Sequence, residues 1–328
     1  MAKTSDPKIN FIDRPVERCE EDYAVAIRDM TDYLASVEGI RTIYQVGSVT
    51  AAGISDIDML VIGKPGEVIS GDPRNACKAD RYLFVHELFG VSENDWADLK
   101  RFTFLHNYHL LYGDPPQETG GHLTETQEKE LKIQIAFEFL IKMYLVLYIQ
   151  RCYRLIKLRS FLLEAKALIY DLEFLGTTQG ALFDQIHEVI DVRNRWFTRT
   201  PDDATIERLV HRVFHALEDY LHEQLTAHTL YLPSEEKINV FGHCQLSPGS
   251  SMALQHRGFY LPLPSFLPER KRFNIQHRFN RFSSTLPYRS APPGSIVMER
   301  FKRLSDIKQR GRQCLPGYYT PASSLGIL

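Results

Sequence analysis

Apolar side chains recur at helical spacing near the start of the chain. Between residues 15 and 38 they lie three or four positions apart: Tyr23, Ile27, Met30, Leu34 and Val37. This period places them on one face of an amphipathic helix. Asp13 and Pro15 are typical of a helix start, and Gly39 is typical of a helix end. We therefore predict a helix over residues 15–38.

The pattern then changes to short apolar runs rich in β-branched residues, which indicate strands. Such runs cover residues 42–46 and 59–62, and two later ones cover 82–88 and 108–112. A helical stretch is expected between the last two runs, from about residue 93 to 105. The first third of the chain is therefore predicted to combine a small mixed sheet with helices.

Longer apolar helices are predicted from Thr124 onward. Thr124 and Gln127 have the spacing of a capping box ahead of a long apolar run. Further helices are expected at about residues 159–175, 181–197 and 203–226, where apolar positions again follow a helical period. Together these helices predict a bundle that packs through its apolar stripes.

Beyond residue 231 the regular pattern is lost. This segment is rich in Pro, Gly, Ser and Arg, and its prolines are expected to prevent long regular elements. We therefore predict an α+β protein: a small mixed-sheet domain over residues 1–120, a helical bundle domain over 121–230, and an irregular, basic, Pro/Arg-rich C-terminal extension over 231–328. The tail from about Pro262 is expected to be dispensable for folding of the first 230 residues.

Composition predicts the cellular compartment of the protein. Of the 328 residues, 44% are hydrophobic and 24% charged, which is typical of a globular protein. The five cysteines are scattered without paired spacing, so we expect free thiols in a reducing cytoplasm. The most apolar run, residues 133–149, is interrupted by Gln134, Glu138 and Lys142, which favours a core helix over a membrane span. We therefore expect a soluble protein without a membrane partner.

Charge is distributed unevenly along the chain. The net charge is −2, yet residues 269–312 contain 12 Lys or Arg and only three acidic residues. Such a segment can bind an anionic partner such as nucleic acid, and the acidic remainder of the same protein can serve equally well. Both interpretations stay open at this point.

The most informative stretch is residues 47–61. Gly47 and Ser48 close one predicted strand, and Asp56 and Asp58 directly precede the next. Because side chains alternate along a strand, the two aspartates project from the same face, with their Cα atoms about 6–7 Å apart. Two such carboxylates can hold Mg²⁺ or Mn²⁺ together with substrate phosphates. The Gly-Ser turn lets a phosphate approach backbone N–H groups, so the stretch predicts a site for a nucleoside triphosphate.

This stretch resembles the signature of the DNA polymerase beta nucleotidyltransferase superfamily: Gly-Ser, a short spacer, then acid, hydrophobic residue, acid. Gly47, Ser48, Asp56 and Asp58 match it position by position, and the resemblance covers about residues 15–114. The helices that follow make the chain similar to kanamycin-type and minimal nucleotidyltransferases. The resemblance implies metal-dependent transfer of a nucleoside monophosphate, AMP from ATP being favoured, to a hydroxyl of an unidentified acceptor, with release of pyrophosphate.

A third carboxylate usually completes such a metal site. Glu87, in the apolar run 82–88, is the favoured catalytic and metal-binding candidate, and Asp114, in a Gly-Asp-Pro turn, is the alternative. His86, His106 and His109 also lie near predicted strands. Histidines in such positions are usually structural, and we expect the same here.

One departure from the family pattern leaves alternatives open. Many relatives carry Arg or Lys soon after the Gly-Ser pair, whereas residues 49–52 here are uncharged, so Lys64, Lys132 or Lys142 would have to balance the phosphates. The missing basic residue favours, as an alternative, a catalytically inactive nucleotide-binding or protein-interaction module with the same fold. The basic tail favours a nucleic-acid-directed nucleotidyltransferase.

Overall fold

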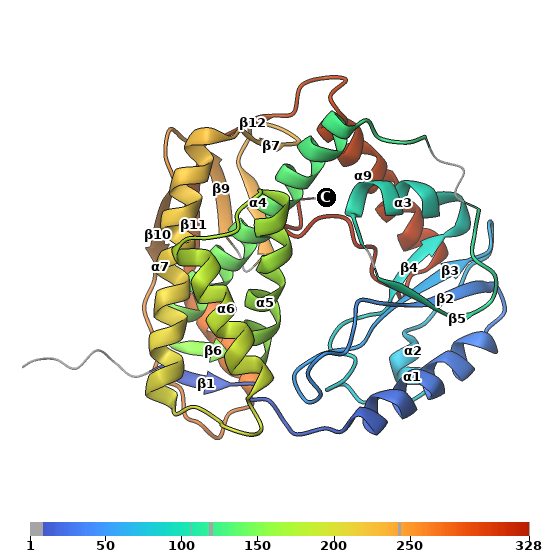
Figure 1. Cartoon of the computed structure of the whole chain (residues 1–328), viewed down its shortest axis with the longest axis horizontal. Helices are drawn as coiled ribbons and strands as arrows, with labels where there is room; N and C mark the ends of the chain where they lie inside the picture. The colour runs from blue at the N-terminus through green and yellow to red at the C-terminus, as the bar shows by residue number, and fades with distance from the viewer. Residues whose placement is uncertain (1–8, 106, 118–120, 242–243, 328) are drawn as a thin grey trace, which may run out of the picture. The chain divides into compact units, whose positions relative to one another are not determined.

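The protein is described by a computed structural model, which covers residues 9–105, 107–117, 121–241 and 244–327. The chain forms two compact units (Figure 1). The N-terminal unit consists of Val16–Leu131 and Pro292–Ser323. The central unit consists of Met1–Pro15, Lys132–Ala291 and Ser324–Ile327. The chain is thus a mixed α/β protein, and its division by contacts differs from the sequential one expected from the sequence.

A four-stranded mixed sheet in the order β4-β3-β2-β5 is the base of the N-terminal unit. β2 (Ile40–Val46) pairs antiparallel with β3 (Asp58–Gly63) on one side and with β5 (Tyr108–Tyr112) on the other. β4 (Phe89–Ser92) pairs parallel with β3. The runs predicted as β2, β3 and β5 are therefore strands, while the run at 82–88 is a turn and loop ahead of β4.

Helices and a 3-10 turn accompany this sheet in the N-terminal unit: α1 (Glu20–Ala35), α2 (Pro73–Ala76), η1 (Glu93–Asp95) and α3 (Trp96–Thr103). α1 has the amphipathic face that its sequence predicts. Its buried residues Tyr23, Met30 and Leu34 share one core with Ile43 of β2 and Met59 of β3. The apolar residues of the predicted helix and strands in the first third of the chain thus form this core.

The C-terminal segment completes the same unit, which corrects the expectation of an irregular tail. α9 (Ile296–Cys314) contacts α3 and β4 and buries one apolar face: Ile296, Val297, Phe301, Leu304 and Ile307. The following residues run along β4, where Gly90 N donates to Tyr319 O and Tyr319 N donates to Leu88 O. The prolines at 292 and 293 do not prevent α9, because they precede its N-cap, Ser295.

Four long helices follow β5 along the chain, close to the predicted ranges: α4 (Glu125–Cys152), α5 (Leu158–Phe174), α6 (Ala181–Asn194) and α7 (Asp203–Ala227). The capping box ahead of α4 is present, since Gln127 N donates to Thr124 Oγ1 and Thr124 N donates to Gln127 Oε1. Among the described residues, α4 alone is long and apolar enough to cross a membrane. Since 72% of its apolar window is buried, it behaves as a core helix, consistent with a soluble protein.

The rest of the central unit is also regular rather than irregular. A second mixed sheet has the order β10-β11-β9-β8. It is formed by four short strands: β8 (Ile238–Val240), β9 (Cys244–Pro248), β10 (Ala253–Arg257) and β11 (Arg281–Leu286). Further elements are α8 (Glu269–Phe279) and two parallel strand pairs, β1 (Asn10–Ile12) with β6 (Leu155–Lys157) and β7 (Leu230–Leu232) with β12 (Tyr288–Ser290). Strands of three to six residues lie between the prolines or end on one, as β9 ends at Pro248. The spacing of the prolines therefore did not exclude regular structure.

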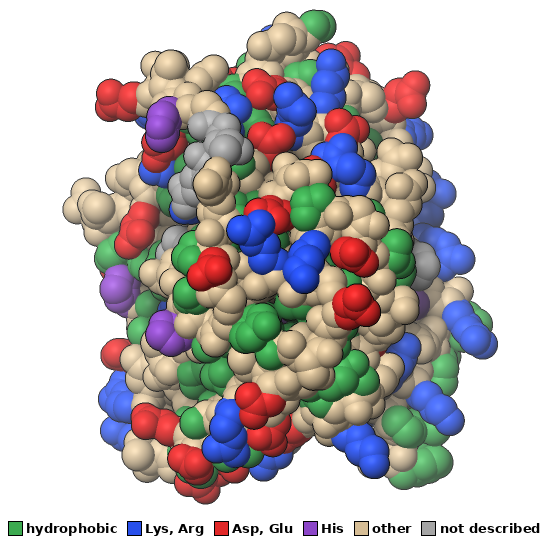
Figure 2. Space-filling model, turned by 90° about the vertical axis from the view of Figure 1, so that its right-hand side faces the viewer, with side chains coloured by type: hydrophobic (Ala, Val, Ile, Leu, Met, Phe, Trp, Pro, Cys, Tyr) green, Lys and Arg blue, Asp and Glu red, His purple; other side chains and the backbone are tan. Residues whose placement is uncertain are grey.

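Part of the basic charge of the C-terminal segment is paired with acidic residues of its own unit. Arg310 of α9 pairs with Asp95 of η1 at 2.6 Å, and Arg303 of α9 pairs with Asp98 of α3 at 3.8 Å. In the reverse direction, Glu299 of α9 pairs with Arg101 of α3 at 3.5 Å. Figure 2 shows one face of the molecule on which acidic and basic side chains are interspersed. Acidic residues of the same protein are therefore one partner of this basic segment. This agrees with the interpretation that the segment binds the acidic remainder of the chain.

A buried carboxyl group gives the helical part a pH-dependent stability. Asp171 of α5 is 5% exposed, and burial raises its pKa well above the ordinary value, only partly opposed by the charge of Lys142 on α4. A carboxyl whose pKa is raised by folding stabilises the fold fully below its unfolded pKa, and that contribution is lost as the pH rises through the folded pKa. Asp171→Asn should therefore increase the free energy of unfolding at pH 7–8 by about 1–3 kcal/mol.

Urea unfolding of the wild type and Asp171→Asn at pH 8 and at the lowest pH at which both are folded measures this effect. The gain should shrink toward acid pH, where Asp171 is protonated. Asp219→Asn, at an exposed position of α7, is the matched control. A loss of stability in Asp171→Asn at pH 8 would mean that the charged form is the stabilising one.

Candidate metal centre

The residues singled out by the sequence motif meet at one edge of the N-terminal sheet. Val46, the last residue of β2, is the register partner of Asp58, the first residue of β3. Gly47 and Ser48 directly follow Val46, and Asp56 lies two residues before Asp58, so all four motif residues lie at this edge. Gly47 has a left-handed φ of +72°, and a Cβ there would meet nothing within 4 Å. The turn that leaves β2 is therefore open beside the aspartates.

The loop between Ser48 and Asp56 is held by α1. Tyr23, which is buried, donates its hydroxyl to Ser55 O at 2.7 Å and accepts from Gly53 N at 3.0 Å. Within the loop, Ser55 N donates to Ala51 O at 2.8 Å. This anchoring fixes the approach to β3 and hence the position of Asp56.

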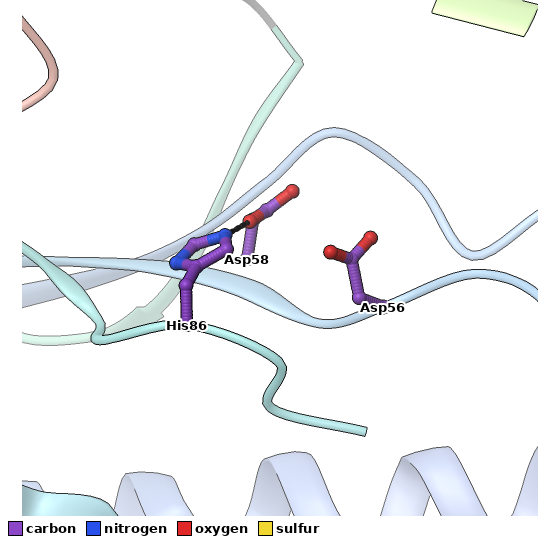
Figure 3. A group of neighbouring side chains, drawn as sticks. All are labelled: Asp56, Asp58 and His86. Atoms are coloured by element: carbon purple, nitrogen blue, oxygen red, sulfur yellow. Dashed lines mark hydrogen bonds and ion pairs between the residues drawn. The ribbon is translucent and has the colours of Figure 1, made fainter. Parts of the chain in front are cut away.

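A third side chain joins the two aspartates. The ligand atoms of Asp56, Asp58 and His86 all lie within 4.8 Å of one another (Figure 3). His86 Nε2 is 2.8 Å from Asp58 Oδ1, and His86 Nδ1 is 2.6 Å from the carbonyl oxygen of Glu87. Because both partners can only accept, both ring nitrogens must donate, and the ring is an imidazolium in this arrangement.

Electrostatics agree with this protonation state. Burial by itself lowers the pKa of His86, but the hydrogen bond and charge of Asp58, the Glu87 carbonyl and the charge of Asp56 together raise it to about 9. The imidazolium therefore acts as the counter-charge of the carboxylate pair in this state. A metal cation at the same point would take over that role, because the ring would then offer a lone pair instead of a proton.

The topology of the sheet explains why His86 arrives here. β3 and β4 are parallel and Leu60 is the partner of Phe89, so the residues just before β4 reach the edge at which β3 begins. The sequence predicted a strand beside the aspartates, but it placed this strand at residues 82–88, whereas β4 begins at Phe89. Neighbouring residues of an extended segment point to opposite sides, and it is His86, not Glu87, that faces the carboxylates.

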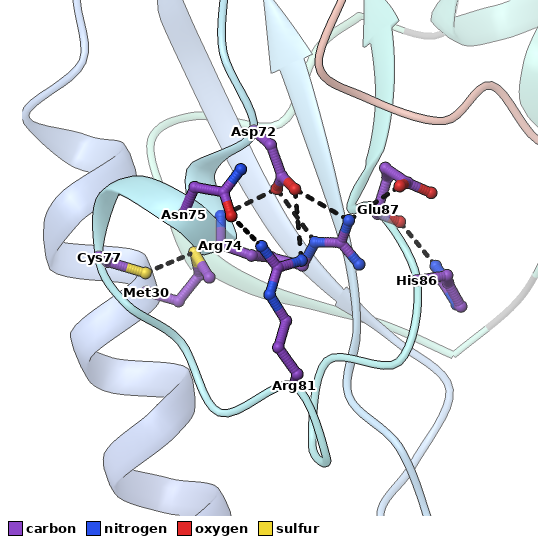
Figure 4. Close-up of polar contacts among 8 residues, drawn as sticks. All are labelled: Met30, Asp72, Arg74, Asn75, Cys77, Arg81, His86 and Glu87. Carbon is purple, nitrogen blue, oxygen red and sulfur yellow. Dashed lines mark hydrogen bonds and ion pairs between the residues drawn. The ribbon is translucent and has the colours of Figure 1, made fainter. Parts of the chain in front are cut away.

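Glu87 belongs to a different group of charges, on the side of α2 (Figure 4). Arg74, which is 5% exposed, donates Nη2 to Glu87 Oε1 at 2.9 Å and also bonds both carboxylate oxygens of Asp72. The backbone N–H of Glu87 and the Arg74 guanidinium hold the pKa of Glu87 below its ordinary value. Glu87 is thus a surface partner of Arg74, and the structure does not bring it to the aspartates.

The alternative third carboxylate lies at the other end of the sheet. The carbonyl oxygen of Asp114 accepts from Thr42 Oγ1 at 2.6 Å, near the start of β2, whereas the motif lies at its end. Gly113 fixes this turn, because a Cβ there would come within 2.0 Å of Arg41 O. Asp114 is therefore separated from Asp58 by the length of β2.

None of the three lysines considered for the phosphates lies beside the aspartates within the N-terminal unit. Lys64 follows the last residue of β3, about 20 Å from Asp58 at roughly 3.3 Å per residue. Lys132 lies over the ring of Phe174 and Lys142 pairs with Glu164, both within the central unit.

Of the other two candidate histidines, His109 does not join the cluster. His109 is exposed on β5 opposite Gln45, and His106 lies outside the described residues. His86 is thus the site residue that the sequence analysis undervalued. The feature that could have indicated it is its position, three residues before β4, which runs parallel to the strand that begins at Asp58.

Comparison of the chain with models of protein families, with curated proteins and with solved structures finds no match. The function must therefore be argued from the chemistry of the site. Carboxylates suit Mg²⁺ and Mn²⁺, while an imidazole ligand favours transition metals over Mg²⁺. The three side chains could hold one divalent cation, and a donor set that includes an imidazole favours Mn²⁺ over Mg²⁺.

Proposed function

We propose that the N-terminal unit is a divalent-metal-dependent nucleotidyltransferase. It transfers a nucleoside monophosphate, AMP from ATP in the favoured case, to the hydroxyl of an acceptor and releases pyrophosphate. The observation that supports this is the meeting of the Gly47-Ser48 turn with Asp56 and Asp58 at one edge of the sheet. Asp56 and Asp58 hold the metal, and the turn holds the triphosphate through its N–H groups and the Ser48 hydroxyl.

The reaction requires positioning and charge balance more than covalent participation of the protein. The acceptor oxygen forms a bond to the α-phosphorus while the bond from that phosphorus to the pyrophosphate oxygen breaks, and the hydroxyl proton passes to a carboxylate of the pair. A bound divalent metal would neutralise the phosphates and acidify the acceptor hydroxyl. The exposed Ser48 and the open turn at Gly47 leave room for the nucleotide next to the aspartates.

The proposed reaction also defines the cofactor, the substrates and the expected compartment of the protein. Mg²⁺ or Mn²⁺ is the cofactor, a nucleoside triphosphate is the donor, and the acceptor offers a hydroxyl. The five cysteines are free thiols, which suits a reducing cytoplasm.

A second candidate function is a nucleotide-binding module without turnover. His86 already neutralises Asp58, and residues 47–58 contain neither Lys nor Arg to stabilise leaving pyrophosphate. Incubation with labelled nucleoside triphosphates and Mg²⁺ or Mn²⁺ separates the two functions. Metal-dependent release of pyrophosphate supports the transferase, and saturable nucleotide binding without pyrophosphate supports the module.

The third metal ligand can be identified by comparing His86→Asn with Glu87→Gln. We expect His86→Asn to weaken Mn²⁺ binding by about tenfold or more, because it removes an imidazole donor beside the aspartates. Glu87→Gln should have a smaller effect, because it breaks only the ion pair with Arg74. Calorimetric titration with Mn²⁺ measures both. A larger loss in Glu87→Gln would show that the segment before β4 turns over when metal binds, as the sequence-based assignment of Glu87 requires.

A further inference from the structure

The exposed face of the second sheet is hollowed. The hollow has a volume of about 490 Å³ and is lined by residues of β8, β9, β10 and β11 together with Lys237, just before β8. This volume lies in the range of roughly 300–1,000 Å³ that small-molecule sites occupy. The whole lining belongs to the central unit, so it is separate from the metal centre proposed above.

The strand register builds an ordered polar row across this face. Gln255, Ser283, Gln245 and Asn239 are successive register partners on β10, β11, β9 and β8. Their sequence neighbours on these strands, among them Phe282 and Leu246, point to the buried side. The row therefore presents amide and hydroxyl groups side by side, each able to donate and accept hydrogen bonds. Such an array matches a ligand rich in hydroxyl groups.

Next to this row, two arginines face each other. Arg257 of β10 and Arg281 of β11 are register partners, and both are exposed. Like charges directly opposite on neighbouring strands destabilise a sheet. Lys237 adds a third positive charge, and none of the described residues that line the hollow is acidic. An anion between the two arginines would remove this repulsion.

The arginines can bind such an anion. Arg281 donates Nη1 to the carbonyl oxygens of His277 and Asn280, at 3.0 and 2.9 Å, which orients the guanidinium and leaves Nε and Nη2 for a ligand. The planar guanidinium matches two oxygens of a phosphate. A phosphate group offers three terminal oxygens to the two guanidinium groups and therefore fits this pair.

The aromatic content of the hollow decides between a small ligand and a nucleic-acid strand. Among the described lining residues Phe282 is the aromatic one; it is 3% exposed, and its ring packs against His256, Tyr148 and Tyr153. Single strands are held without sequence preference by aromatic rings on which the bases stack. Because this ring is turned inward, the described lining offers no ring on which a base could stack, so the polar row and the arginine pair favour a small molecule.

We propose that this face binds a small, hydroxyl-rich phosphate monoester. The phosphate lies between Arg257 and Arg281, and the hydroxyl groups of the ligand bond the row from Gln255 to Asn239. Sugar phosphates and ribonucleotides share this chemistry. The proposal does not depend on the proposed nucleotidyltransferase.

The test measures binding of glucose 6-phosphate, AMP, glucose and inorganic phosphate to the full chain by calorimetry. EDTA and an Asp58→Asn background remove any contribution of the metal centre. The first variant is Arg257→Ala, which removes one arginine of the pair. Its matched control is Arg278→Ala, an exposed arginine of α8 outside the lining. A second variant, Gln245→Val, removes an amide from the row and keeps a side chain suited to a strand.

We expect at least one phosphate monoester to bind more tightly than glucose or inorganic phosphate. Arg257→Ala should weaken that binding by about tenfold or more, Gln245→Val by less, and Arg278→Ala not measurably. Binding of neither monoester, equal binding in Arg257→Ala, or equal affinity for glucose would overturn the proposal. If a single-stranded oligoribonucleotide binds while AMP and glucose 6-phosphate do not, the face is a nucleic-acid groove and the proposal is also wrong.

Discussion

Asp58→Asn should abolish nucleotidyl transfer, with turnover lower by about a thousandfold or more, because it removes a charged metal ligand at the point where phosphate charge must be neutralised. The change conserves the shape of the side chain. The amide oxygen that replaces the carboxylate could still accept the hydrogen bond that His86 Nε2 gives to Asp58. Unfolding in the absence of metal should therefore change little, so that loss of activity cannot be ascribed to loss of fold.

A matched control is available at the opposite end of the same sheet. Asp114→Asn makes the same chemical change at an exposed residue near the start of β2. Pyrophosphate release, Mn²⁺ binding and urea unfolding of both variants give the decisive comparison. Near wild-type turnover in Asp58→Asn, or an equal loss in Asp114→Asn, would remove the assignment of Asp58 and with it the proposed function.

The elements that frame this site could be predicted because their signals are local. The β-branched runs of β2 and β3 and the Gly-Ser and Asp-x-Asp pairs lie within 22 residues of one another, from Ile40 to Val61. Antiparallel pairing of consecutive strands then brings Gly47 and Asp58 to the same edge without further information. The same holds for the helices α4 to α7, whose apolar period and capping box stand in the sequence itself.

The third side chain of the site could not be predicted, because it depends on where a strand begins. A strand that started at Tyr82 and one that starts at Phe89 make different residues face the aspartates. A shift of one residue reverses the face of every side chain. This difference decides between Glu87 and His86. The apolar residues Leu83 and Phe84, which suggested the strand, are instead buried in a turn anchored on Asp80.

The position of the C-terminal segment could not be predicted for another reason: the residues that it contacts are about 200 positions away in sequence. Arg300, which is 3% exposed, donates Nε to Phe102 O, and Arg310 forms a bidentate pair with Asp95. A charge count treats such arginines as a free basic patch. Only the tertiary structure shows that they bind the body of the protein.

Removal of residues 292–328 should therefore unfold the N-terminal unit, contrary to the expectation that the first 230 residues fold without the tail. α9 buries five apolar side chains against this unit, and burial of each contributes about 1.5–3 kcal/mol. Together they approach the whole stability of a typical domain, about 5–15 kcal/mol. The truncation would also expose the edge of β4, where Tyr319 now exchanges hydrogen bonds with Leu88 and Gly90.

A point variant tests the same idea without deleting the segment. Phe301→Ala should lower the free energy of unfolding by about 3–5 kcal/mol, because Phe301 is 2% exposed in the core formed with α3 and β4. Lys302→Ala, the exposed neighbour on the same helix, should change it little. Urea unfolding followed by Trp96 fluorescence, with Trp196 replaced by Phe in every variant, reports on this unit, since Trp96 begins α3. If the truncated chain unfolds cooperatively with an unchanged Trp96 transition, α9 is a surface attachment and the N-terminal unit folds without it.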